Sequence, residues 1–311
     1  PSLFGDRGFH STAVMGYFGA AAGSANLLGL SDEQTAHALS FAAAYASGLA
    51  NWIKGGMVKY LHAGKAARGG VEAALLAGGG LTGPRQVFEG KRGFCRAYSD
   101  RTDMEAIISG LGQRWKTMEV HLKPHCTSRH TQSSVEAAAK IAAENNLRAE
   151  DIAALEIVTS HEMAEALSTK EPVDVIEAQS SIPFATVTGL FKGGSRTLTE
   201  FVLFEDIQKA MESPVVSSLL ERTTLRGDSV FDVKKGNAQI TIRCNDGNQY
   251  TEKVDIIRGS PENPFTFQEV RERFLDQTGG ILPGDRLIRA ADLIERLDAV
   301  EKIETITGLL S

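Results

Sequence analysis

Cysteine is scarce in this chain of 311 residues, and its three cysteines lie far apart in the sequence. Cys95, Cys126 and Cys244 form no Cys-x-x-Cys pair, and their odd number does not suit a disulfide framework. An iron–sulfur cluster is not expected either, because its ligands usually include neighbouring cysteines. This sparing use of cysteine fits the reducing cytoplasm best.

Long apolar runs and an excess of positive charge are also absent. No stretch approaches the roughly 18–20 apolar residues that span a bilayer, and no signal peptide is recognised. Lys and Arg total 33 against 39 Asp and Glu, which gives a net charge of −6. We therefore expect no membrane and no nucleic acid as partner. An anionic substrate would need a local basic pocket.

Patterns typical of cofactor and metal sites are missing as well. The glycines at 78–80 follow no strand and do not form G-x-G-x-x-G, so a nucleotide site is not expected. His121, His125 and His130 lie close in sequence but lack a carboxylate at ligand spacing. We therefore expect neither a cofactor nor a metal.

Small residues and helical patterns dominate the first part of the chain. Helices are predicted from about Ser11 to Leu28, from a capping box at Ser31 to about Gly48, and from about His62 to Ala77. Alanine and glycine recur along them and would let neighbouring helices approach closely. A shorter helix is predicted over 103–111. The length of the chain favours two domains, and this part predicts a large all-helical one.

The pattern changes after about residue 113. Strands are predicted over 115–122 and 154–160, helices over 132–145 and 182–191, and a hairpin whose two strands are joined by Asn245-Asp246-Gly247-Asn248. We expect a smaller α+β domain with an antiparallel sheet, over residues 114–263. The composition of 259–264 indicates a linker, and a capping box at Thr266 opens helices over 264–311 that would pack back on the helical domain of residues 1–113.

Polar side chains able to do chemistry concentrate at three places. His10 follows Gly8-Phe9, Lys59 and His62 open an Ala- and Gly-rich helix, and Lys123 begins a run that ends at Gln132. Imidazole titrates near physiological pH, and lysine can hold a carboxylate. These groups predict an enzyme that moves protons on an acidic metabolite. The alternatives stay open: His10 as a helix-start histidine, Lys59 as a solvated lysine, and His62 as a helix cap.

Six motifs, in order along the chain, resemble those of the MmgE/PrpD family. They are Gly8-Phe9-His10-Ser11-Thr12, Lys59-x-x-His62-Ala63-Gly64-x-Ala66-Ala67, Glu89-Gly90-x-x-Gly93-Phe94, Lys123-Pro124 through Glu136-Ala137-Ala138, Gln179-Ser180-Ser181-Ile182-Pro183-Phe184-Ala185, and Gly259-x-Pro261-x-Asn263-Pro264. The family includes 2-methylcitrate dehydratase, cis-aconitate decarboxylase and iminodisuccinate epimerase.

The resemblance implies a large all-α domain, a smaller α+β domain, a homodimer and a cofactor-independent enzyme. Family members carry well over a hundred residues before the Gly-Phe-His motif. We therefore expect part of the helical domain to be missing here, or to be supplied by a separate N-terminal segment. A non-catalytic subunit that binds a carboxylate or another chain is an alternative on the same ground.

The implied substrate is a small di- or tricarboxylate that loses a proton next to a carboxylate, which requires a base and nearby cations. His10, His130 and Lys59 are the expected catalytic residues. Lys123, His62, Ser128 and Gln132 are expected to bind substrate, although Ser128 and Gln132 could instead cap the following helix.

The run from Lys123 departs from many relatives, because Ser128 and Gln132 stand where these often have Cys or His. Arg129-His130-Thr131-Gln132 resembles a motif of the dehydratase-like members. A hydro-lyase acting on a 2-methylcitrate-like tricarboxylate is therefore the first expectation. An isomerase, such as an iminodisuccinate epimerase, comes second, and a cis-aconitate decarboxylase is a further alternative.

Overall fold

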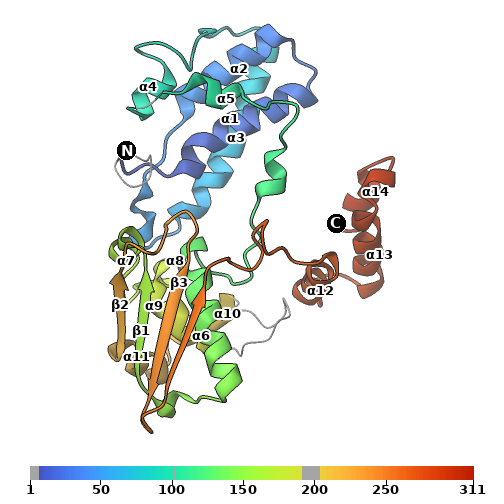
Figure 1. Cartoon of the computed structure of the whole chain (residues 1–311). Helices are drawn as coiled ribbons and strands as arrows, with labels where there is room; N and C mark the ends of the chain where they lie inside the picture. The colour runs from blue at the N-terminus through green and yellow to red at the C-terminus, as the bar shows by residue number, and fades with distance from the viewer. Residues whose placement is uncertain (1–6, 101, 191–203) are drawn as a thin grey trace. The chain divides into compact units, whose positions relative to one another are not determined.

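A computed structural model describes residues 7–100, 102–190 and 204–311 (Figure 1). The chain divides into two compact units, Pro1–Trp115 and Lys116–Ser311. The first unit is helical and the second combines helices with a small sheet. The coarse expectation of a helical part and an α+β part is thereby confirmed. No helix in the described ranges is long and apolar enough to cross a membrane.

Three helices build the first unit: α1 (Ser11–Leu27), α2 (Asp32–Tyr45) and α3 (Val58–Gly78). Shorter elements are η1 (Ala50–Lys54), α4 (Phe94–Tyr98) and α5 (Met104–Ile108). Small residues allow α1 and α3 to pack closely: a Cβ placed on Gly70 would lie 2.3 Å from the Cβ of Ala20. The core of this unit is correspondingly rich in alanine.

The capping box predicted at Ser31 is present, since the Ser31 hydroxyl accepts from the Gln34 N–H and the Gln34 side chain accepts from the Ser31 N–H. Helix α3 begins four residues earlier than the sequence predicts, so Lys59 lies in its first turn. The helix predicted over 103–111 is shorter and ends at Ile108.

The second unit is built around one sheet of four strands in the order β2-β1-β3-β4 (Figure 1). Its elements are η2 (Lys116–Glu119), η3 (Arg129–Thr131), α6 (Gln132–Asn145), η4 (Ala149–Asp151), β1 (Ile152–Thr159), α7 (His161–Ala166), α8 (Val175–Ser180), α9 (Ile182–Leu190), α10 (Phe204–Met211), α11 (Pro214–Glu221), β2 (Thr223–Gly227), β3 (Ala238–Cys244) and β4 (Gln249–Val254). The predicted hairpin is confirmed as β3 and β4.

The predicted antiparallel sheet is a mixed one: β3 pairs antiparallel with β1 and β4, whereas β2 pairs with β1 in parallel. Strand β1 also pairs with β3, and its residues Leu155, Ile157 and Val158 are at most 1% exposed. The face of β1 that carries Leu155 and Ile157 is therefore buried, whereas the Glu156 side chain on the other face is 37% exposed. Helix α6 lies against β3 and β4, while α9 and α11 contact β2 and β1 respectively.

The strand predicted over 115–122 does not form. Trp115, Met118 and Val120 are 71%, 77% and 59% exposed, and the only regular element there is the short η2. An alternating pattern becomes a strand only where a neighbouring strand can pair with it. Within the described residues the sheet is complete without this segment.

The chain ends in α12 (Phe267–Thr278), α13 (Gly284–Glu295), η5 (Leu297–Ala299) and α14 (Glu304–Thr307). Thr266 and Glu269 form the predicted capping box of α12. The stretch 259–264, which its composition predicts to be a linker, is a packed turn, because Gly259 and Ser260 are buried. Docking of the last helices on the first unit stays a prediction.

Candidate active site

A short backbone pairing holds His10 in place at the start of α1. The His10 N–H donates to the Gly48 carbonyl at 2.9 Å, and the Ala50 N–H donates to the Gly8 carbonyl at 2.7 Å. His10 is the N-cap residue of α1, yet its side chain does not cap the helix. The imidazole is therefore available for other contacts.

His10 and His62 form a close pair. Their Nδ1 atoms are 2.8 Å apart, and their ring centroids are 5.0 Å apart. Gly48 makes room for the pair, because a Cβ at this position would lie 3.4 Å from His62 Nε2 and 2.3 Å from the Cβ of Ala13. The structure thus joins two residues that the sequence places on different helices.

The pair resists taking up charge. Burial lowers the pKa of His10 below its ordinary value of 6.5, and the neighbouring His62 and Lys59 lower it further. Burial also lowers the pKa of His62, with Lys65 as the second cause. At neutral pH both rings are then mainly neutral, and one Nδ1–H donates to the other Nδ1. A proton added to this pair is readily given up again.

Trp52 links this pair to Lys59. The Lys59 ammonium lies 4.4 Å from the centre of the indole, and the His10 ring centroid lies 5.2 Å from that of Trp52. Such cation–π contacts are worth about 0.5–2 kcal/mol. Sequence reasoning did not single out Trp52, although it is one of only two tryptophans and follows the glycine that pairs with His10.

The second unit contains the other candidate lysine. Lys123 is exposed as a residue, but its Nζ turns inward and donates to the Thr127 carbonyl at 3.0 Å. Burial of this ammonium lowers its pKa. The segment after it is held by Gln179, whose carbonyl accepts from the Ser128 N–H at 2.7 Å and whose Nε2 donates to the Cys126 carbonyl at 2.9 Å. From the sequence alone, Gln179 was recognised only as part of a family motif.

Gln132 organises the loop that it follows. It is 1% exposed, and its Nε2 donates to Thr127 Oγ1 at 2.8 Å and to the Ser128 carbonyl at 3.0 Å. Its Oε1 accepts from the His125 N–H at 3.0 Å. These contacts tie Gln132 to the loop before α6 and not to the free backbone N–H groups of that helix. The side chain of Ser128 does not cap η3 either.

His130 lies in η3 and is largely buried. Burial, and next the charge of Arg129, lower its pKa to about 4. Its Nδ1 is enclosed and has no hydrogen-bond partner within the described residues. His130 is therefore neutral at physiological pH, and its burial opposes protonation.

The structure brings together His10, Lys59 and His62 in the first unit, and Lys123, Ser128, His130 and Gln132 in the second, the latter along one short segment. Within the described ranges, no three His, Cys, Asp or Glu side chains are placed to hold a metal.

Comparison with known proteins agrees with the motifs. Residues 2–107 match the MmgE/PrpD N-terminal domain, and residues 125–299 match the MmgE/PrpD C-terminal domain. A cis-aconitate decarboxylase-like protein of Aspergillus oryzae is 28% identical over 98% of this chain and 65% of its own length. The cis-aconitate decarboxylases of Aspergillus terreus and Homo sapiens are each 26% identical, over 98% and 97% of this chain and 65% and 63% of their own. The chain spans less than two thirds of these curated relatives, and it belongs to the MmgE/PrpD family.

Proposed function

We propose that this chain carries catalytic groups of a cofactor-independent lyase that decarboxylates a small tricarboxylate resembling cis-aconitate. The observation that carries the proposal is the His10–His62 pair with the Lys59 ammonium on the adjacent indole. An acid and a cation side by side are what loss of carbon dioxide from such a substrate requires. The names of the relatives support this substrate class.

The chemistry can be written with these groups. The bond between carbon and the departing carboxylate breaks, and its electron pair forms a new double bond to the adjacent carbon. The pair of the original double bond, which is conjugated with a remaining carboxylate, shifts to the carbon that will be protonated. Carbon dioxide leaves, and a proton is delivered to carbon. Lys59 holds a remaining carboxylate and stabilises the developing charge. Lys123, in the second unit, is proposed to bind a carboxylate of the same substrate class.

His10 is the ring proposed to meet the substrate. His62 is only 7% exposed, whereas His10 is half-buried. A proton taken up by His10 would stay hydrogen-bonded to His62 through the two Nδ1 atoms. Because burial lowers the pKa of His10, its imidazolium is a stronger acid than free imidazolium. His62 would then orient His10 without touching the substrate.

A dehydratase is the second candidate, favoured by the Arg129-His130-Thr131-Gln132 motif. The Gln132 amide of this motif donates to Thr127 and Ser128 of the preceding loop, which weakens the preference for a dehydratase. His130 is the residue proposed as the base of this reaction, although burial opposes its protonation. We also propose that the chain forms a homodimer.

The test is turnover in heavy water followed by NMR, with cis-aconitate, 2-methylcitrate, citrate and iminodisuccinate. We expect carbon dioxide from cis-aconitate, with one solvent deuteron in the product. Loss of water from 2-methylcitrate would instead establish the dehydratase, and deuterium exchange without a new double bond would establish the epimerase. Either result would overturn the decarboxylase.

Variants of the first cluster sharpen the test. His10→Gln and Lys59→Met should each lower turnover at least 100-fold, a typical effect of losing an acid or a charge-stabilising group. Arg68→Met is the matched control, because Arg68 lies on the same helix α3 with its side chain exposed. Unchanged turnover in both test variants would refute the assignment of this cluster.

A further inference from the structure

The segment that carries Lys123 is held by residues much later in the chain. The Leu122 N–H donates to the Gly259 carbonyl at 2.8 Å. Gly259 has φ +85°, and a Cβ placed on it would lie 1.9 Å from the Leu122 carbonyl oxygen. The two backbones therefore pack directly on each other, and only glycine fits there.

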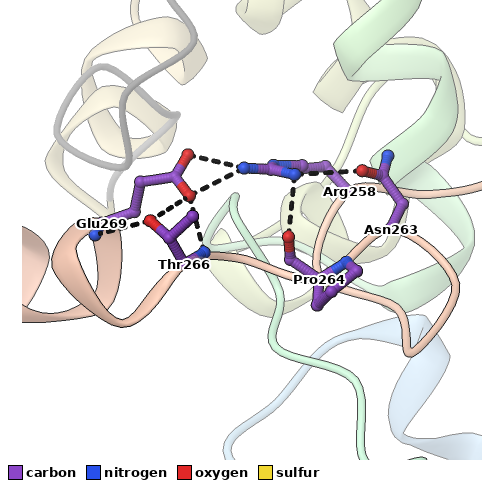
Figure 2. A network of polar contacts seen from close by, with 5 residues as sticks. All are labelled: Arg258, Asn263, Pro264, Thr266 and Glu269. Carbon is purple, nitrogen blue, oxygen red and sulfur yellow. Dashed lines mark hydrogen bonds and ion pairs between the residues drawn. The ribbon is translucent and has the colours of Figure 1, made fainter.

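Arg258, which precedes Gly259, links this turn of the chain to the start of α12 (Figure 2). One of its terminal nitrogens donates to both carboxylate oxygens of Glu269, at 2.6 and 2.8 Å. The other donates to Asn263 Oδ1 at 3.0 Å and to the Pro264 carbonyl at 2.8 Å. The two charged side chains are only 27% and 19% exposed, which makes this pair stronger than an ordinary surface ion pair.

Glu269 also closes the capping box of α12. Its carboxylate accepts from the Thr266 N–H at 2.7 Å and from the Thr266 hydroxyl at 2.8 Å (Figure 2). The first turn of α12 is thus fixed both internally and to Arg258. This fixes the direction in which the helix leaves the packed turn.

Arg273 follows Glu269 by one helical turn and shares its face of α12. Its guanidinium donates to the carbonyl of Lys123 at 3.1 Å and to that of Pro124 at 2.7 Å. Both sides of Lys123 are therefore held from the C-terminal part of the chain, through Gly259 on Leu122 and through Arg273 on the lysine itself and the next residue.

We propose that Arg273 is a positioning residue that fixes the backbone of Lys123, so that the lysine presents its ammonium to a substrate carboxylate. The identity of the ligand rests on the function proposed above, whereas the positioning of Lys123 does not. Loss of Arg273 leaves two carbonyls without their charged donor and frees the segment. A misplacement of about 1 Å at a binding group is enough to weaken substrate binding severely.

The kinetic test compares Arg273→Met with Arg271→Met. Arg271 lies on the same helix and pairs with Asp292 of α13 at 2.6 Å. We expect Arg273→Met to raise KM about 10-fold or more and to leave kcat within about twofold, as for the loss of uniform binding. Arg273→Lys, which keeps a charged donor, should restore part of the loss. Arg271→Met should change neither constant.

A second readout does not require activity. Lysines are reductively methylated with ¹³C-formaldehyde, and the resonance that vanishes in Lys123→Arg is assigned and titrated by NMR. Burial lowers the pKa of the Lys123 ammonium, so release of the segment in Arg273→Met should move its titration to higher pH. Glu269→Gln, which weakens the pair with Arg258, should move it the same way by less. Glu269→Gln also provides the titration test if Arg273→Met fails to fold.

The outcomes separate the two proposals. A shifted titration together with a raised KM supports both. A shifted titration in a protein that turns over none of the four acids supports the positioning role and removes the proposed function. An unchanged titration and an unchanged KM in folded Arg273→Met overturn the positioning role.

Discussion

Acidification should destabilise the second unit through two buried histidines. His125 is 4% exposed, and burial, with a smaller contribution from the charge of Arg273, lowers its pKa to about 3. Burial and Arg129 lower the pKa of His130 to about 4. As the pH falls below the ordinary pKa of 6.5, these two histidines are therefore protonated in the unfolded chain but stay neutral in the folded chain. Stability is then full above pH 6.5 and falls as the pH drops towards 4 and 3.

The size of the effect follows from the ordinary pKa alone, since both folded values lie well below pH 5.5. Between pH 7.5 and pH 5.5, each histidine should lower the free energy of unfolding by about 1.4 kcal/mol. His125→Asn removes one titrating group and should remove about 1.4 kcal/mol of this pH dependence. The comparison uses the slope against pH, so any constant loss of stability in the variant cancels.

Urea-dependent hydrogen exchange of the peptide that covers β3 measures the opening of this unit alone. The unmutated chain, measured at the same pH values, is the reference. If His125→Asn kept the full loss between pH 7.5 and pH 5.5, His125 would have to be protonated in the folded state. The burial argument would then be wrong.

Three further predictions test other parts of the structure. Gly259→Ala should destabilise the second unit by on the order of 3 kcal/mol in urea unfolding, because its Cβ meets the Leu122 carbonyl. Gly247→Ala, at φ +89° with nothing within 4 Å, should cost only about 1 kcal/mol, and equal losses would refute the clash. Trp52→Leu should lower turnover about 10-fold while Trp52→Phe keeps most of it, since phenylalanine keeps an aromatic ring beside the Lys59 ammonium and leucine does not; equal activities would contradict this. Decarboxylation rates should fall as pH rises, because the histidine pair must take up a proton, and a rate that rises with pH would point to a base-catalysed elimination.

Local signals in the sequence predicted local structure well. The capping boxes at Ser31 and Thr266 and the Asp246-Gly247 turn are each formed by residues within a few positions of one another. Their chemistry is therefore visible in a short window of sequence. The bounds of α6 match those predicted, and β1 differs from its predicted range by two residues at its start and one at its end.

Pairings between distant segments could not be predicted in this way. Strand β2 is short and carries Thr223, Thr224 and Arg226. Its pattern therefore does not predict a parallel pairing with β1, which lies 60 or more residues earlier. The segment 115–122 alternates but pairs with no strand of the described sheet, and most of its side chains are exposed. Pattern alone does not say whether a sheet edge will be available.

For the candidate site too, the residues could be predicted from the sequence but their contacts could not. The motifs singled out His10, Lys59 and His62, but only the fold shows that two imidazoles share one hydrogen bond. Trp52 was missed because an indole in a glycine-flanked turn resembles any core aromatic.

The contacts of Gly259 and Arg273 with the Lys123 segment affect the order in which the chain folds during its synthesis. A ribosome releases the chain from its N-terminal end, so Lys123 emerges long before the residues that fix it. Until α12 has been synthesised, the segment around Lys123 lacks its two C-terminal contacts. Lys123 therefore reaches its final position only late in the synthesis of the chain. In nascent chains that stall before α12, the segment around Lys123 should not yet be held in place.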